Sequence, residues 1–220
     1  MGWDPVWEKT FRERDWGRYP EEELVRFVAR NFYRAPERAA VKMLEIGCGP
    51  GSGTSWFIAR EGFSVTGIDA SPTAVAKARK RFAEERLHGE FVDGTVDILP
   101  FTGESFDAVI DIVCLAYNSE QETGAILGEV RRVLKPGGMH FSLTPRNGCW
   151  GDAGGERIDR TTLREVSEGP FAGFGKTRFA TRESLVELYA GFRDLTLEHT
   201  TRSAENGTRE ITHWVVTCRK

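Results

Sequence analysis

The chain has 220 residues, of which 40% are hydrophobic and 29% carry a charge, so it can bury a core as one domain over residues 1–220. A formal net charge of −3 provides no electrostatic footprint for a phosphate backbone, and we expect no nucleic-acid partner. No apolar run approaches the roughly 20 residues of a membrane span, so we expect no membrane partner.

The N-terminus and the cysteines are typical of a cytoplasmic protein. Residues 1–5 lack the basic and apolar regions of a secretory signal. The cysteines are far apart and form no CxxC pair, which argues against a disulfide framework or a metal site. They are Cys48, Cys114, Cys149 and Cys218.

Predicted helices and short apolar strands alternate along the first two thirds of the chain. Pro20 and the three acids after it begin a helix, since proline and negative charge both favour a first turn. Alternation of this kind implies a parallel sheet with helices on both faces. We predict helices over 20–34, 53–61, 71–86 and 119–134, and strands over 42–46, 64–68, 89–93, 106–113 and 139–143.

The last third has a different pattern. Residues 145–180 are rich in glycine and irregular, and we expect a mobile loop that caps the acceptor side. A helix begins at Thr181 and ends before Gly191. Two alternating runs then flank Asn206-Gly207, a strong hairpin signal, so the sheet is expected to end in an antiparallel pair.

A glycine-rich turn carries the most specific chemical signal. Residues 45–53 read Glu-Ile-Gly-Cys-Gly-Pro-Gly-Ser-Gly, and glycines at a strand-to-helix turn let a ligand approach the backbone amides. Asp69 ends the next predicted strand, where a carboxylate can accept both hydroxyls of a ribose. A dinucleotide fingerprint requires a third glycine at position 52, where Ser52 stands.

The loop, spaced G-x-G-x-G and preceded by an acid, resembles the first motif of class I S-adenosylmethionine-dependent methyltransferases. Three further segments resemble the family in the right order, and together they cover residues 43–144. These segments are VTGIDAS at 65–71, DILPF with SFD at 97–107, and RRVLKPGG at 131–138. The resemblance implies an α/β fold, Rossmann-like and doubly wound, with a mainly parallel seven-stranded sheet and an antiparallel C-terminal hairpin.

The same resemblance implies a site for S-adenosylmethionine. Asp69 would take the ribose, the glycine loop would take the methionine tail, and Glu45 would hold the ammonium directly or through water. Alternatively, Glu45 is a strand-end acid that makes a cap or a surface pair, and Asp69 caps the next helix. The loop and strand-end residues expected at the cofactor are Glu45, Gly47, Cys48, Gly49, Gly51, Asp69, Ala70, Ser71 and Val113.

Two positions near the site depart from simple expectations. The family usually carries an acid five residues before the proline of its LPF segment, and this chain has Thr95. We expect the Thr95 hydroxyl and the Val96 backbone to line the adenine, with Asp93 as the alternative acid. Asp111 interrupts an apolar run. Because a buried unpaired carboxylate is costly, Asp111 either faces the cofactor ammonium or marks the strand end.

Residues 1–40 are expected to form a helical lid segment. Aromatic faces attract cations, so Tyr19 is a candidate catalytic residue at the sulfonium, and Arg18 would meet the tail carboxylate. In the alternative interpretation, three tryptophans merely anchor a helix to the sheet. They are Trp3, Trp7 and Trp16.

For function, we expect methyl transfer to an O or N atom of a small-molecule acceptor by direct displacement, which mainly requires alignment and exclusion of water. Tyr117 is the candidate wall or proton acceptor, while the four histidines are expected to be structural. Arginines in 145–180 hint at an anionic acceptor, although solvated arginines are the default. A non-catalytic S-adenosylmethionine-binding protein and an NAD(P)-dependent oxidoreductase stay open, as do a monomer and a homodimer.

Overall fold

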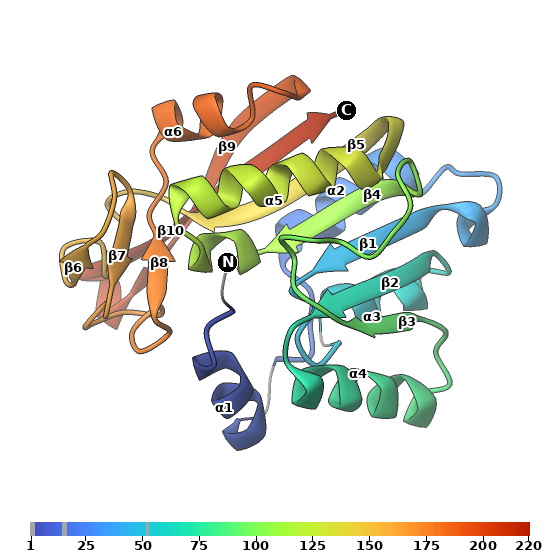
Figure 1. Ribbon diagram of the computed structural model, residues 1–220, viewed down its shortest axis with the longest axis horizontal. Coiled ribbons are helices and arrows are strands. Elements are labelled where there is room, and N and C mark those ends of the chain that lie inside the picture. Colours follow the sequence, from blue (N-terminus) through green and yellow to red (C-terminus); the bar gives the residue numbers. More distant parts are fainter. Residues whose placement is uncertain (1–2, 15–16, 52) are drawn as a thin grey trace.

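The computed structural model describes residues 3–14, 17–51 and 53–220. Seven strands form one sheet in the order β3-β2-β1-β4-β5-β10-β9 (Figure 1). The first five strands run parallel, and β10 is antiparallel to both β5 and β9. This confirms the predicted α/β fold with its antiparallel C-terminal hairpin. The strands are β1 (Lys42–Ile46), β2 (Ser64–Asp69), β3 (Glu90–Asp93), β4 (Phe106–Ile112), β5 (Leu134–Pro145), β9 (Arg193–Ala204) and β10 (Arg209–Arg219).

Helices cover both faces of the sheet because its central strands are apolar on both sides. Met43 of β1 packs into a core with α2, α3 and α4. Its neighbour Leu44 points the opposite way, into a second core with α5 and α6. The bounds of these helices are α2 (Glu22–Phe32), α3 (Thr54–Arg60), α4 (Pro72–Glu84), α5 (Glu120–Val133) and α6 (Arg182–Leu188).

Side chains cap the starts of α4 and α5. The Ser71 hydroxyl accepts a hydrogen bond from the Ala74 amide, and Pro72 occupies the first turn of α4. Ser119 and Glu122 form a reciprocal capping box at the start of α5. These local bonds satisfy backbone donors that a helix start otherwise leaves unpaired.

The segment from 145 to 180 is more ordered than the sequence indicated, so the expectation of an irregular loop is wrong. It contains a three-stranded antiparallel sheet, which Figure 1 shows at one end of the molecule. Leu163, Phe171 and Phe179 are buried in a core of its own. The strands are β6 (Glu156–Arg157), β7 (Thr162–Arg164) and β8 (Lys176–Arg178).

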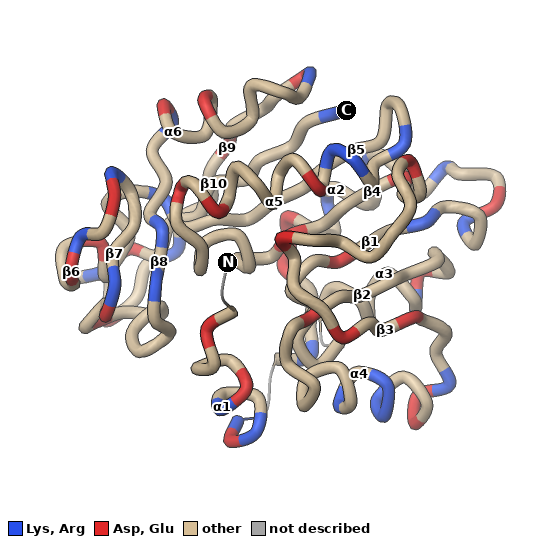
Figure 2. Tube along the Cα trace, viewed as in Figure 1, with Lys and Arg blue, Asp and Glu red and all other residues tan. Residues whose placement is uncertain are grey.

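The N-terminal helix α1 (Val6–Glu13) lies beside α4 at the edge of the sheet (Figure 1). Figure 2 shows acidic and basic residues intermixed along the chain. Two residues of the basic run of α4 pair with acids four residues further on. Lys80 contacts Glu84, and Arg81 contacts Glu85. Over the described ranges, no helix is both long and apolar enough to cross a membrane.

Candidate functional site

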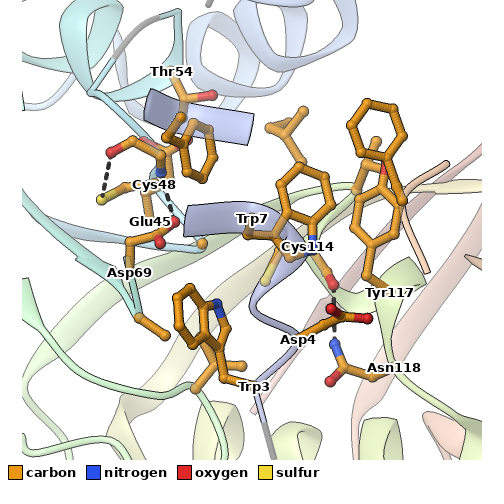
Figure 3. Close-up of a pocket in the computed structure, with 18 of the residues that line it drawn as sticks. Trp3, Asp4, Trp7, Glu45, Cys48, Thr54, Asp69, Cys114, Tyr117 and Asn118 are labelled. Carbon is orange, nitrogen blue, oxygen red and sulfur yellow. Dashed lines mark hydrogen bonds between the residues drawn. The ribbon is translucent and has the colours of Figure 1, made fainter. Parts of the chain in front are cut away.

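A cavity of about 470 Å³ opens where β1, β2 and β4 end, which is where open α/β sheets bind ligands. In Figure 3, Glu45, Cys48 and Asp69 lie together in one part of this cavity, whereas Trp7 and Tyr117 lie in another. We call the first part the donor end and the second part the aromatic end.

The glycine loop forms the donor end and has no room for side chains. Gly47 and Gly49 have φ angles of 65° and 52°, which only glycine adopts at little cost. A Cβ at Gly47 would collide with Cys114, and one at Gly49 would lie 3.3 Å from Phe11. The Cys48 amide donates to the carbonyl of Ile68 at 3.0 Å, which ties the loop to β2.

Asp69 presents a carboxylate at the end of β2 and is 7% exposed. Its Oδ2 accepts from the Gly49 amide at 2.9 Å and its Oδ1 from the Ser71 amide at 2.8 Å. Burial raises the pKa of Asp69, while these two bonds act to lower it. Since a carboxylate has about four lone-pair sites, each oxygen retains capacity to accept a further hydrogen bond. The side chain therefore suits a sugar diol.

Glu45 lies in the wall of the same end and is almost fully buried. Its Oε2 accepts from the Ser55 hydroxyl and, at 3.0 Å, from the Ser55 amide. Burial raises the pKa of Glu45 to about 8, against the lowering effect of hydrogen bonds from Ser55 and Thr54. The carboxyl is therefore mainly protonated at neutral pH, and a bound cation would favour its ionised form.

Helix α1 docks over the donor end. Glu8 accepts hydrogen bonds from the hydroxyls of Ser71 and Thr73 at the start of α4, and these bonds lower the pKa of Glu8. Lys77 Nζ donates to the carbonyl of Phe11 at 2.6 Å. The buried Phe11 ring then lies against the glycine loop. These contacts hold α1 against both α4 and the glycine loop.

The aromatic end is built from three separate parts of the chain. Trp7 of α1 stacks on Phe174 with ring centroids 5.0 Å apart and packs edge-on against Tyr117 at 4.5 Å. Lys176 forms an ion pair with Glu122, and both residues line the cavity. Burial raises the pKa of Tyr117 well above its usual range. The phenol is protonated at neutral pH, and Tyr117 lines the cavity.

Most of the residues selected from the sequence lie on the cavity wall. These are Tyr19, Glu45, Gly47, Cys48, Gly49, Asp69, Ala70, Thr95, Val96, Val113 and Tyr117. Four others do not line it: Arg18, Gly51, Ser71 and Asp111. Trp16 and Ser52 lie outside the described residues. Asp93, the alternative to Thr95, instead contacts Arg79 on the surface at 3.4 Å.

Asp111 has a different place from the one expected at the cofactor. It is fully buried. Its Oδ1 accepts from the Leu115 amide at 3.0 Å, and its Oδ2 accepts from the Ser142 hydroxyl at 2.5 Å. Burial raises the pKa of Asp111 to about 6, against these two bonds. Asp111 therefore braces the turn after β4, where Val113 adopts a left-handed φ of 67°.

The other three residues off the wall have local explanations. Arg18 is exposed. A Cβ on Gly51 would meet that of Ala78 at 2.8 Å, so this glycine permits the loop to pack on α4. Ser71 caps α4 and contacts α1. Tyr19 reaches the mouth of the cavity but is 81% exposed, with its ring edge-on to Trp56.

Sequence reasoning missed much of the aromatic end. None of the arginines in 145–180 lines the described cavity wall, so the hint of an anionic acceptor has no support from them. Arg160, for example, pairs on the surface with Glu120 and Glu187. Wall residues that were not selected include Trp7, Phe11, Thr54, Cys114, Asn118, Glu122, Phe171, Phe174 and Lys176. The i, i+4 spacing of Trp7 and Phe11 was the available signal for α1.

Comparison with known proteins agrees with this geometry. Residues 43–138 match the family described as a methyltransferase domain. The phthiotriol/phenolphthiotriol dimycocerosates methyltransferase of Mycobacterium leprae is 34% identical over 148 residues, covering 64% of this chain and 53% of that protein. The chain spans about half the length of the curated relatives it matches.

Solved structures share the fold. A SAM-dependent methyltransferase from Methanosarcina mazei aligns with a TM-score of 0.68 and 25% identity, over 81% of this chain and 92% of its own. The 1,6-didemethyltoxoflavin-N1-methyltransferase of Burkholderia thailandensis, solved with S-adenosylhomocysteine, aligns with a TM-score of 0.59 and 19% identity, over 89% of this chain and 82% of its own. Residues 43–138 therefore form a methyltransferase domain, and the strand order and the glycine-loop site agree with the fold of S-adenosylmethionine-dependent methyltransferases.

Proposed function

We propose that this protein transfers a methyl group from S-adenosylmethionine to an O or N atom of a small-molecule acceptor by direct displacement. The observation that supports this most strongly is the continuity of the cavity, which joins a donor end suited to an adenosyl cofactor with a separate aromatic end. When bound, S-adenosylmethionine supplies a methyl carbon that bonds to the acceptor lone pair while its sulfur keeps the electrons of the broken C–S bond.

The residues of the donor end fit this cofactor. Asp69 would accept hydrogen bonds from the ribose, and the bare backbone at Gly47 and Gly49 would meet the methionine tail. Thr95 and Val96 would border the adenine. Glu45 would ionise and hold the ammonium. The glycine backbone has no Cβ atoms to block the cofactor, and two carboxyl groups beside it can accept hydrogen bonds from the cofactor's hydroxyl and ammonium groups.

The protein's remaining task is alignment and exclusion of water. Helix α1 would act as the lid, since Phe11 covers the glycine loop and Glu8 secures the helix to α4. Closure of this kind orients the reactants and strengthens electrostatic interactions inside the site. Because the Tyr117 phenol stays protonated, we propose that a group other than Tyr117 takes the proton that the acceptor releases.

A methyl-incorporation assay tests this proposal. Purified protein is incubated with S-adenosylmethionine labelled in its methyl group and with separate pools of small alcohols, phenols, amines and N-heterocycles. We expect labelled product from at least one pool, and less product with Asp69→Ala when S-adenosylmethionine is limiting. Binding of S-adenosylhomocysteine without transfer to any pool would favour a non-catalytic binding protein. Binding of NAD(P) alone would overturn the donor assignment.

A further inference from the structure

We propose that the acceptor is a flat aromatic or heteroaromatic ring that carries a hydroxyl or N–H group. This inference rests on the proposed function, because it takes the aromatic end of the cavity as the acceptor site. It is carried by the rings that converge there and by the polar pair beside them.

Four rings form what we call the aromatic wall: Trp7, Tyr117, Phe171 and Phe174. They come from α1, from the short helix η2 (Cys114–Tyr117) and from the turn between β7 and β8. The rings of Trp7 and Phe174 are stacked and nearly parallel, with 6° between their planes, and Tyr117 meets Trp7 at 63°. The wall therefore presents rings in both parallel and edge-on orientations.

The wall is held in place by its surroundings. Phe171 is buried and packs edge-on against Phe179 with centroids 5.7 Å apart. Arg14 lies 5.8 Å from the Phe174 centroid. Rings held in this way lose little freedom when a ligand stacks on them. Aromatic pairs prefer offset-stacked or edge-on contact, which a flat ring can make with this wall and a puckered saturated ring cannot.

A polar group lies beside the rings. Glu122 lines the cavity, and hydrogen bonds from Lys176 and Ser119 keep its pKa low despite the raising effect of burial. Glu122 is therefore a carboxylate, an acceptor for an O–H or N–H donor. Asn118 also lines the cavity, and its amide nitrogen donates to the Cys114 carbonyl at 3.0 Å. A ring with a polar hydrogen complements both features.

Equilibrium binding of a matched pair of probes tests the proposal. The probes are 2-naphthol and decahydro-2-naphthol, which share a carbon skeleton and a hydroxyl but differ in flatness. They are titrated by calorimetry into the 220-residue chain saturated with S-adenosylhomocysteine. We expect 2-naphthol to bind at least tenfold more tightly than its saturated counterpart.

Two ring deletions localise the preference. Phe174→Leu and Trp7→Leu keep an apolar side chain and should each reduce the preference to threefold or less. Trp150→Leu is the control, because this half-buried tryptophan lies in the same 145–180 segment as Phe174 but off the cavity wall. This variant should leave the preference unchanged. Circular dichroism checks that the three variants fold alike.

Several results would overturn the aromatic acceptor. These are equal affinities for the two probes, no detectable binding of either, or a preference that survives both Phe174→Leu and Trp7→Leu. The proposed function fails separately, through loss of S-adenosylhomocysteine binding in the same calorimeter. Transfer of labelled methyl only to saturated alcohols or amines would retain the proposed function while contradicting this inference.

Discussion

Raising the pH from 6 to 8 should strengthen the binding of S-adenosylhomocysteine, and Glu45→Gln should remove most of that change. Burial raises the pKa of Glu45 to about 8 in the free protein. About nine in ten of these carboxyls therefore carry a proton at pH 7. If the ligand ammonium pairs with the ionised form, binding releases that proton.

The magnitude follows from the linkage between binding and ionisation. If a group must lose one proton before the ligand binds, each pH unit below the pKa of that group weakens binding tenfold, or by about 1.4 kcal/mol. The affinity should therefore increase by about tenfold per unit from pH 6 towards 8 and then level off. Glu45→Gln at pH 8 should bind about as weakly as the natural chain at pH 6.

Calorimetry in buffers of different ionisation enthalpy, such as phosphate and Tris, counts the protons released at pH 7. We expect close to one proton from the natural chain. Glu45→Gln is the control, because any proton still released with this variant comes from the ligand amine or another group. Equal proton release from the two proteins would refute the pairing of Glu45 with the ammonium.

The same raised pKa predicts how stability changes with pH. The folded protein holds a proton on Glu45 that the unfolded chain, with a pKa near 4.5, has already lost. This contribution to stability is fully present below pH 4.5 and is lost as the pH rises towards 8. Urea denaturation should show a shallower decline in stability for Glu45→Gln across this window, and equal slopes would contradict the raised pKa.

Three further substitutions test the supports of the site. Gly47→Ala should lower the free energy of unfolding, measured by urea denaturation, by about 1–3 kcal/mol more than Gly137→Ala does. Both positions have a left-handed φ, but only a Cβ at position 47 meets Cys114. Equal losses for the two variants would contradict the clash. Glu8→Gln should speed amide hydrogen exchange in α1 about fivefold, for a loss of about 1 kcal/mol, and unchanged exchange would argue against the clamp on α4. Asp111→Ala leaves two buried donors unpaired and should lower the free energy of unfolding by about 2–6 kcal/mol; unchanged stability would contradict its bracing role.

The donor end could be predicted from the sequence because its signals are local. A strand, a glycine-rich turn and a helix follow one another in 42–60, and Asp69 ends the next strand. Ser71 and Pro72 mark the start of α4 by capping chemistry. Each of these features depends on a few consecutive residues, whose conformational preferences do not require knowledge of the rest of the fold.

The aromatic end could not be predicted in the same way. Trp7 and Phe174 meet through tertiary packing of segments that are far apart in the sequence. The strands β6–β8 have two or three residues each, too few to show an alternating pattern. The burial that determines the ionisation of Tyr117 and the place of Asp111 also depends on distant elements.

The most direct test of the donor site is the affinity for S-adenosylhomocysteine, measured by calorimetry at pH 8 for the natural chain, Asp69→Ala and Asp93→Ala. Asp69→Ala should bind about 5- to 150-fold more weakly, which corresponds to the ~1–3 kcal/mol of a lost buried polar partner. Asp93→Ala, an acid opposite Asp69 on β3 but off the cavity wall, should bind normally. Equal affinities for all three proteins, or tighter binding of NAD(P) than of S-adenosylhomocysteine, would contradict the assignment of this cavity.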